Sequence, residues 1–130
     1  MGLFDKIFKS EREIAKEEIV EVPWKLLTTE EQLNEIETRS KEKTVVIFKH
    51  STRCGISKMV LRTFEKDYNQ SGDVELYFLD LIENRGLSNS VAEKFSVRHE
   101  SPQMIILKDS LVVHHASHQD ISAGKISDFT

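Results

Sequence analysis

The stretch Cys54-Gly55-Ile56-Ser57 contains the only cysteine among the 130 residues, and a cysteine thiolate is a strong nucleophile. One cysteine rules out a disulfide within the chain, and the simplest compartment for such a chain is the reducing cytosol. A dithiol redox motif would have cysteine at both ends, whereas Ser57 stands at the second position. A serine hydroxyl cannot resolve a mixed disulfide, but it can donate a hydrogen bond to the Cys54 sulfur. The motif therefore predicts monothiol chemistry, in which an outside thiol releases what Cys54 has captured.

The sequence around Cys54 predicts a strand followed by a helix. Residues 44–48 (TVVIF) form a short β-branched and aromatic run, which predicts a strand buried on both faces. Apolar residues then recur at three- and four-residue spacing, namely Ile56, Met59, Val60 and Phe64. This spacing predicts a helix from about Cys54 to Tyr68. The unpaired N–H groups and partial positive charge of a helix N-terminus favour the thiolate, which is the attacking form of cysteine.

Basic residues lie near Cys54 in the sequence and could support the thiolate or attract an anionic substrate. Arg53 is adjacent, and Lys58 follows one helical turn later. Lys49 and His50 end the predicted strand. Each of these residues could equally be ordinary solvated surface charge.

The rest of the chain predicts an alternation of strands and helices. Thr28 with Glu31, or Thr29 with Gln32, matches a capping box. Asp120 is expected to cap a short final helix. The predicted strands are 24–27, at a sheet edge, 44–48, 74–79, 104–107 and 111–115, and the predicted helices begin near 28, 54, 87 and 120. The resulting order is β-α-β-α-β-α-β-β-α, in which a parallel β-α-β crossover must be right-handed.

Composition and charge limit the possible classes of protein. Hydrophobic residues make up 38% and charged residues 31%, and the formal net charge of −4 gives no overall basic field for nucleic acid. No apolar run is long enough to span a membrane, and no signal peptide is visible. Residues 1–20 form a charged, partly amphipathic arm that could dock loosely or lie on a membrane surface, although no stable membrane association is expected. Residues 21–130 are predicted to form one domain.

Ser101-Pro102 directly precedes the predicted strand 104–107. Proline is the residue before which a cis peptide bond is common enough to expect in a folded protein. A trans proline at the start of a strand explains the same sequence, so both geometries remain open at this point.

Three segments together resemble the monothiol bacilliredoxin family of Gram-positive bacteria. They are residues 50–57 (HSTRCGIS), 97–103 (VRHESPQ) and 115–118 (HASH), and the similarity covers about residues 22–129. The resemblance implies an α/β, thioredoxin-like fold, a central mixed sheet flanked by helices, in agreement with the element order. It also implies removal of bacillithiol, a low-molecular-weight thiol, from mixed disulfides on cytosolic proteins. Bacillithiol would be a co-substrate, and neither a cofactor nor a metal is expected.

The resemblance also implies roles for individual residues. Cys54 would be the attacking thiol and Ser57 would occupy the vacant resolving position. Pro102 would be a cis-proline that shapes the substrate groove together with Ser101. Arg53 and Lys58 would attract the malate carboxylates of bacillithiol.

Gly55 departs from the pattern, because family members often have proline after the cysteine. The departure produces Cys-Gly-x-Ser, which is similar to the motif of monothiol glutaredoxins that carry a [2Fe–2S] cluster between two subunits. An iron–sulfur carrier therefore remains an alternative, although no glycine-pair loop precedes the last helix. A thioredoxin-like binding module with an inert thiol is a second alternative.

Two other kinds of site are less well supported by the sequence. The cluster of His114, His115 and His118 could bind a metal, but adjacent residues on a strand point to opposite faces. Partly exposed histidines at a strand end explain the cluster better. Phosphatase chemistry is excluded, because Val60 stands where a cysteine phosphatase carries its phosphate-binding arginine.

Overall fold

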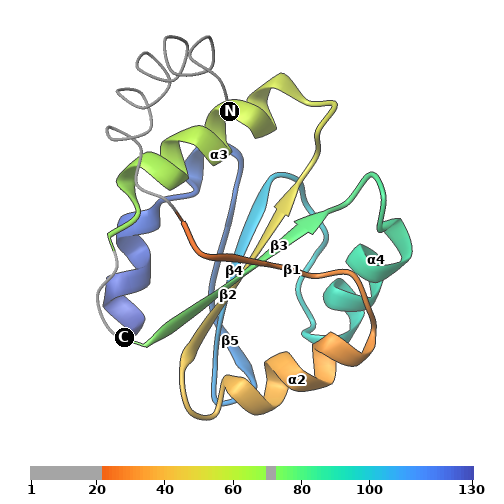
Figure 1. The fold of residues 1–130 in the computed structure, drawn as a ribbon, viewed down its shortest axis with the longest axis vertical. Coiled ribbons are helices and arrows are strands. Elements are labelled where there is room, and N and C mark those ends of the chain that lie inside the picture. Colours follow the sequence, from red (N-terminus) through yellow and green to blue (C-terminus); the bar gives the residue numbers. More distant parts are fainter. Residues whose placement is uncertain (1–21, 70–72) are drawn as a thin grey trace, which may run out of the picture.

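A five-stranded sheet in the order β1-β3-β2-β4-β5 forms the centre of the computed structural model, which describes residues 22–69 and 73–130 (Figure 1). Its strands are β1 (Trp24–Leu26), β2 (Thr44–His50), β3 (Val74–Asp80), β4 (Gln103–Lys108) and β5 (Leu111–Ser117). Strands β1, β2 and β3 are parallel, whereas β4 runs antiparallel to both β2 and β5. The mixed sheet confirms the predicted fold class. The predicted arm of residues 1–20 lies outside the described residues.

Helices cover both faces of this sheet. They are α2 (Glu31–Arg39), α3 (Gly55–Asp67) and α4 (Arg85–Lys94), followed by the 3₁₀ segments η1 (His118–Asp120) and η2 (Ala123–Phe129). Helices α2 and α4 lie on one face, and α3 lies with the C-terminal segment on the other (Figure 1). No helix within the described residues is long and apolar enough to cross a membrane.

Alternation along β2 separates the core into two clusters. Val45 and Ile47 pack beneath α2 and α4, whereas Val46 and Phe48 pack beneath α3. All four side chains are buried, since both faces of a central parallel strand are covered. The same parity directs the last two residues of β2 to opposite faces, which decides their different roles at the site.

The closing element differs from the prediction of a helix capped by Asp120. Asp120 instead ends η1, and Ser122 is the N-cap of η2 without a side-chain capping bond. Ile121 and Ser122 have extended backbone angles, so they separate two short 3₁₀ segments. A seven-residue segment that contains glycine is too short and too weak in helix propensity to sustain an α-helix alone.

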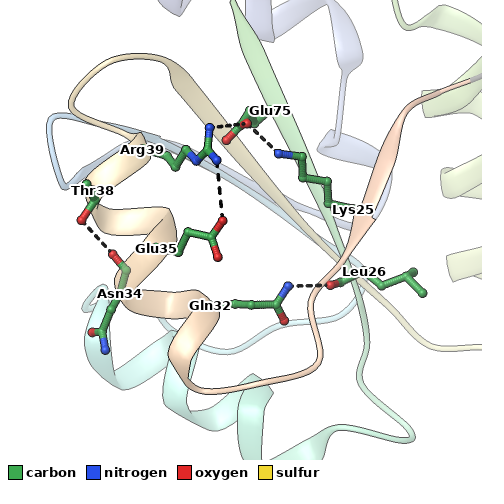
Figure 2. Close-up of polar contacts among 8 residues, drawn as sticks. All are labelled: Lys25, Leu26, Gln32, Asn34, Glu35, Thr38, Arg39 and Glu75. Atoms are coloured by element: carbon green, nitrogen blue, oxygen red, sulfur yellow. Dashed lines mark hydrogen bonds and ion pairs between the residues drawn. The ribbon is translucent and has the colours of Figure 1, made fainter.

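Helix α2 is attached to the sheet by polar contacts at both ends (Figure 2). Gln32 Nε2 donates to the Leu26 carbonyl at 2.9 Å, and Gln32 Oε1 accepts the backbone N–H groups of Thr28 and Thr29. This is the glutamine half of the predicted capping box, while Glu30 occupies the N-cap. Buried Glu75 of β3 accepts from Lys25 at 2.7 Å and from Arg39 at 3.3 Å, and so joins β1, β3 and α2.

Candidate active site

Cys54 is the N-cap residue of α3, directly after the turn that leaves β2. Its backbone is extended, with φ −107° and ψ 120°, its N–H donates to the Ser51 carbonyl at 3.2 Å, and its own carbonyl accepts the Lys58 N–H at 3.1 Å. The free thiol is partly exposed, and the first turn of α3 contains no acidic residue. The position predicted for Cys54 is therefore confirmed, and the N-terminus of α3 places partial positive charge beside this residue.

Ser57 is fully buried and has a different partner from the one predicted. Its Oγ lies 2.8 Å from His50 Nδ1 and accepts the Ser51 N–H at 3.0 Å. Among the hydrogen bonds of the described residues, none joins Ser57 Oγ to the Cys54 sulfur. The hydroxyl therefore fixes the start of the turn that carries Cys54. Its effect on Cys54 is to position the sulfur by way of this turn.

His50 is buried at the end of β2, on the α3 side of the sheet, where its ring lies 5.4 Å from the Phe78 ring. Burial lowers its pKa below the ordinary value, as does the nearby charge of Lys58, against opposing effects of Asp80 and Glu65. A neutral imidazole with its proton on Nε2 can accept a hydrogen bond from the Ser57 hydroxyl at Nδ1. His50 thus supports the turn as a neutral acceptor rather than as a cation beside the thiolate.

The Ser101-Pro102 peptide bond is cis. Gln103, which follows it, pairs with Lys49 in the register of β4 and β2, so this loop lies at the same end of the sheet as Cys54. A hydrogen bond inside the loop stabilises it, because the Gln103 side chain donates to the Arg98 carbonyl at 2.8 Å. Ser101 Oγ is buried and has no hydrogen-bond partner among the described residues.

The basic residues near Cys54 in the sequence do not all lie beside it. Arg53 and Lys58 are exposed on the turn and on the first turn of α3, and neither belongs to an ion pair within the described ranges. Lys49, in contrast, is fully buried on the opposite face, where Nζ lies 3.1 Å from both the Ser88 carbonyl and His99 Nδ1. The expectation that Lys49 supports the thiolate is wrong, because strand parity directs its side chain towards α4.

The contacts of Lys49 and Ser57 were missed by sequence reasoning. Extending the buried strand by two residues would have placed Lys49 in the same row as Val45 and Ile47, beneath α4. No sequence signal could have paired Ser57 with His50, since that contact depends on how α3 packs against β2.

The histidines near the C-terminus are dispersed. The His114 ring stacks on Phe129 with centroids 5.7 Å apart, whereas His115 and His118 are exposed. In the parts of the chain that the structure covers, no group of three potential metal ligands comes together.

The geometry defines a class of protein: a thioredoxin-type α/β domain with a single cysteine at a helix N-cap and a cis-proline at the same end of the sheet. A solved structure described as an inferred oxidoreductase with a thioredoxin fold is 28% identical, with a TM-score of 0.69, and the match covers 81% of this chain and 91% of that one. Thioredoxin f from spinach chloroplast is 20% identical, with a TM-score of 0.60 and coverage of 82% and 88%. The thioredoxin of Fasciola hepatica is 21% identical, with a TM-score of 0.60 and coverage of 81% and 94%.

The model of the monothiol bacilliredoxin BrxC family matches residues 25–126. The chain belongs to this family, and its role is in thiol redox chemistry. The match begins and ends within the predicted domain and includes Cys54, Ser57 and Pro102.

Proposed function

We propose that this protein removes bacillithiol from mixed disulfides on cytosolic proteins, with Cys54 as the nucleophile. Membership of the monothiol bacilliredoxin family supports this choice of thiol. The observation that carries the proposal is the position of Cys54, a partly exposed free thiol at the N-cap of α3 in a chain with no second cysteine.

The reaction has two exchange steps. The Cys54 thiolate attacks the bacillithiol sulfur of the mixed disulfide, so a disulfide forms between Cys54 and bacillithiol while the protein substrate leaves as a thiolate. That thiolate takes a proton from water. An external thiolate then attacks the bacillithiol sulfur and releases Cys54, because the chain has no resolving cysteine.

The surrounding residues would then bind and position the reactants. Exposed Arg53 and Lys58 would attract the carboxylates of bacillithiol, while Ser101 and Pro102 would shape the groove for the protein substrate. Ser57 is a positioning residue, because its hydroxyl is buried against His50 and Ser51 and does not face the solvent.

The proposal is tested by mixing the reduced protein with a model protein that carries one bacillithiol on its single cysteine. Intact-mass spectrometry should show the loss of bacillithiol from the model protein and its appearance on Cys54, followed by release with dithiothreitol. A Cys54→Ser variant should transfer nothing. A wild-type protein that forms no adduct would contradict the proposal, and iron bound to the freshly purified protein would favour the cluster carrier instead.

A further inference from the structure

A pocket of about 240 Å³ opens beside α4, on the face of the sheet opposite α3. Its lining consists of Leu81, Arg85, Ser88, Asn89 and His99. These residues come from the turn after β3, from the first turns of α4 and from the segment that leads to Pro102. Apart from Leu81 the lining is polar, and it contains one permanent cation, the exposed Arg85.

A second cation, Lys49, does not line this pocket itself but contacts two residues that do. Lys49 is fully buried, and its Nζ contacts two of the pocket residues, through the Ser88 carbonyl and His99 Nδ1. One partner is a carbonyl and the other an imidazole nitrogen, and no carboxylate forms an ion pair with Lys49 within the described residues. A buried lysine without an anionic partner is costly, so it is rarely retained unless something compensates its charge. An ammonium group has three donors, which leaves one for a further acceptor.

The start of α4 adds partial positive charge at the same place. Asn84 is the N-cap residue, but its side chain makes no capping bond and instead donates to the Asp80 carbonyl at 3.1 Å. The first turn of α4 contains no acidic residue. The first residue of α4, Arg85, lines the pocket, so the positive end of the helix lies beside it.

From these contacts we infer that the pocket binds a small oxyanion, of the carboxylate or phosphate kind. Arg85 would bind the anion from the exposed side, and the charge of Lys49, which lies behind Ser88 and His99, would attract it, with Ser88 and Asn89 as hydrogen-bonding neighbours. Two acidic residues oppose this charge: Glu83, which precedes the N-cap Asn84, and Glu100, which follows His99. Burial and Lys49 lower the pKa of His99, whereas the field of Glu100 raises it. Two cations and a helix N-terminus act against these two carboxylates, and neither carboxylate lines the pocket.

The site is tested by titrating the full-length, ¹⁵N-labelled protein with malate and, separately, with inorganic phosphate. Saturable shifts are expected for the backbone amides of Leu81, Ser88 and Asn89. Arg85→Gln should raise the dissociation constant about tenfold, because it removes a charge-assisted hydrogen bond. Lys49→Met should raise it by a smaller factor, because Lys49 acts on the anion through its charge and not from the pocket lining. Arg62→Gln, an exposed arginine of α3 on the other face, is the matched control and should bind as the wild type does.

A Cys54→Ser variant should bind the anions unchanged, so the result does not depend on the proposed thiol exchange. Inhibition of thiol transfer by malate in the wild type but not in Arg85→Gln would show that this pocket, and not Arg53 and Lys58, binds the carboxylates of the small thiol. Binding without inhibition would show that the pocket takes a separate anion. The inference is overturned if neither anion gives saturable shifts, or if Arg85→Gln binds as tightly as the wild type.

Discussion

The Ser57 hydroxyl oxygen lies 2.8 Å from His50 Nδ1, and through this contact the residue at the vacant resolving position anchors the end of β2. Ser57 also accepts the N–H of Ser51, the residue whose carbonyl accepts the Cys54 N–H. The side chain at the resolving position thus determines where the turn that presents Cys54 begins. Its contribution to the chemistry is the placement of the sulfur.

Ser57→Ala should destabilise the fold and slow thiol exchange without abolishing it. The substitution leaves His50 Nδ1 and the Ser51 N–H without their buried partner, which costs about 1–3 kcal/mol. Chemical denaturation and the rate of Cys54 alkylation measure the two effects, with Ser127→Ala, an exposed serine, as the control. A variant that retains wild-type stability would show that the Ser57 contacts contribute nothing.

Stability should fall as the pH drops below about 6.5, in part through His50. Burial lowers the pKa of His50 in the fold, so the unfolded chain takes up the proton first and the contribution to stability is lost in acid. His99 and His114 also have lowered pKa values and act in the same direction. The contribution of His50 is therefore the difference between the wild type and His50→Gln. The free energy of unfolding of His50→Gln should fall less steeply in acid than that of the wild type. Identical pH profiles for the two proteins would refute this role.

Stability should rise between about pH 8 and pH 9.5 because of Lys49. Burial lowers the pKa of Lys49 from 10.5 to about 8, so above pH 8 the folded protein releases a proton that the unfolded chain still holds. The full effect, reached near pH 10.5, is on the order of 3 kcal/mol. The pKa of Tyr77 is raised to about 12, so its opposing effect begins only near the ordinary tyrosine value of 10.

The measurement for Lys49 is denaturant unfolding across this pH range in a buffer of low anion content, with Lys49→Met for comparison. The variant should show a flat profile where the wild type rises. His99 is the titratable side chain in contact with Lys49, and its pKa lies below this range. A rise of equal size in the variant would rule out Lys49 as its source.

Glu75→Gln should destabilise the protein by about 1–2 kcal/mol, because it removes the charge that holds both Lys25 and Arg39 (Figure 2). Both cations are more than a third exposed, so hydration by water compensates part of the lost interaction with the Glu75 carboxylate. Glu35→Gln is the matched control, since its ion pair with Arg39 spans 3.8 Å between exposed groups and should contribute no more than about 0.5 kcal/mol. Equal thermal stability of the two variants would contradict this assignment.

The sequence predicted the position of Cys54 well because local signals agree there. A β-branched run ends just before it, and apolar residues at helical spacing begin just after it. The predicted helix limits, Cys54 and Tyr68, are the two cap residues of α3. The family resemblance implied a cis bond at Pro102, which the structure contains, whereas residue properties alone left the geometry open.

Features that depend on packing between distant elements could not be predicted from the sequence. β2 continues through Lys49 and His50 although both are polar, because neighbouring strands and helices supply their partners. The final segment forms 3₁₀ turns rather than a helix, because the extended backbone at Ile121 and Ser122 divides it. The assignments of Arg53, Lys58 and Ser101 to substrate binding remain predictions.

The most direct test of the central claim is single-turnover transfer of bacillithiol from a thiolated model protein to the reduced wild-type protein, followed by intact mass. The account predicts one bacillithiol on Cys54, an equal loss from the substrate, and no transfer by Cys54→Ser. Transfer by the Cys54→Ser variant, or a wild-type Cys54 that stays unmodified while the substrate keeps its bacillithiol, would contradict it.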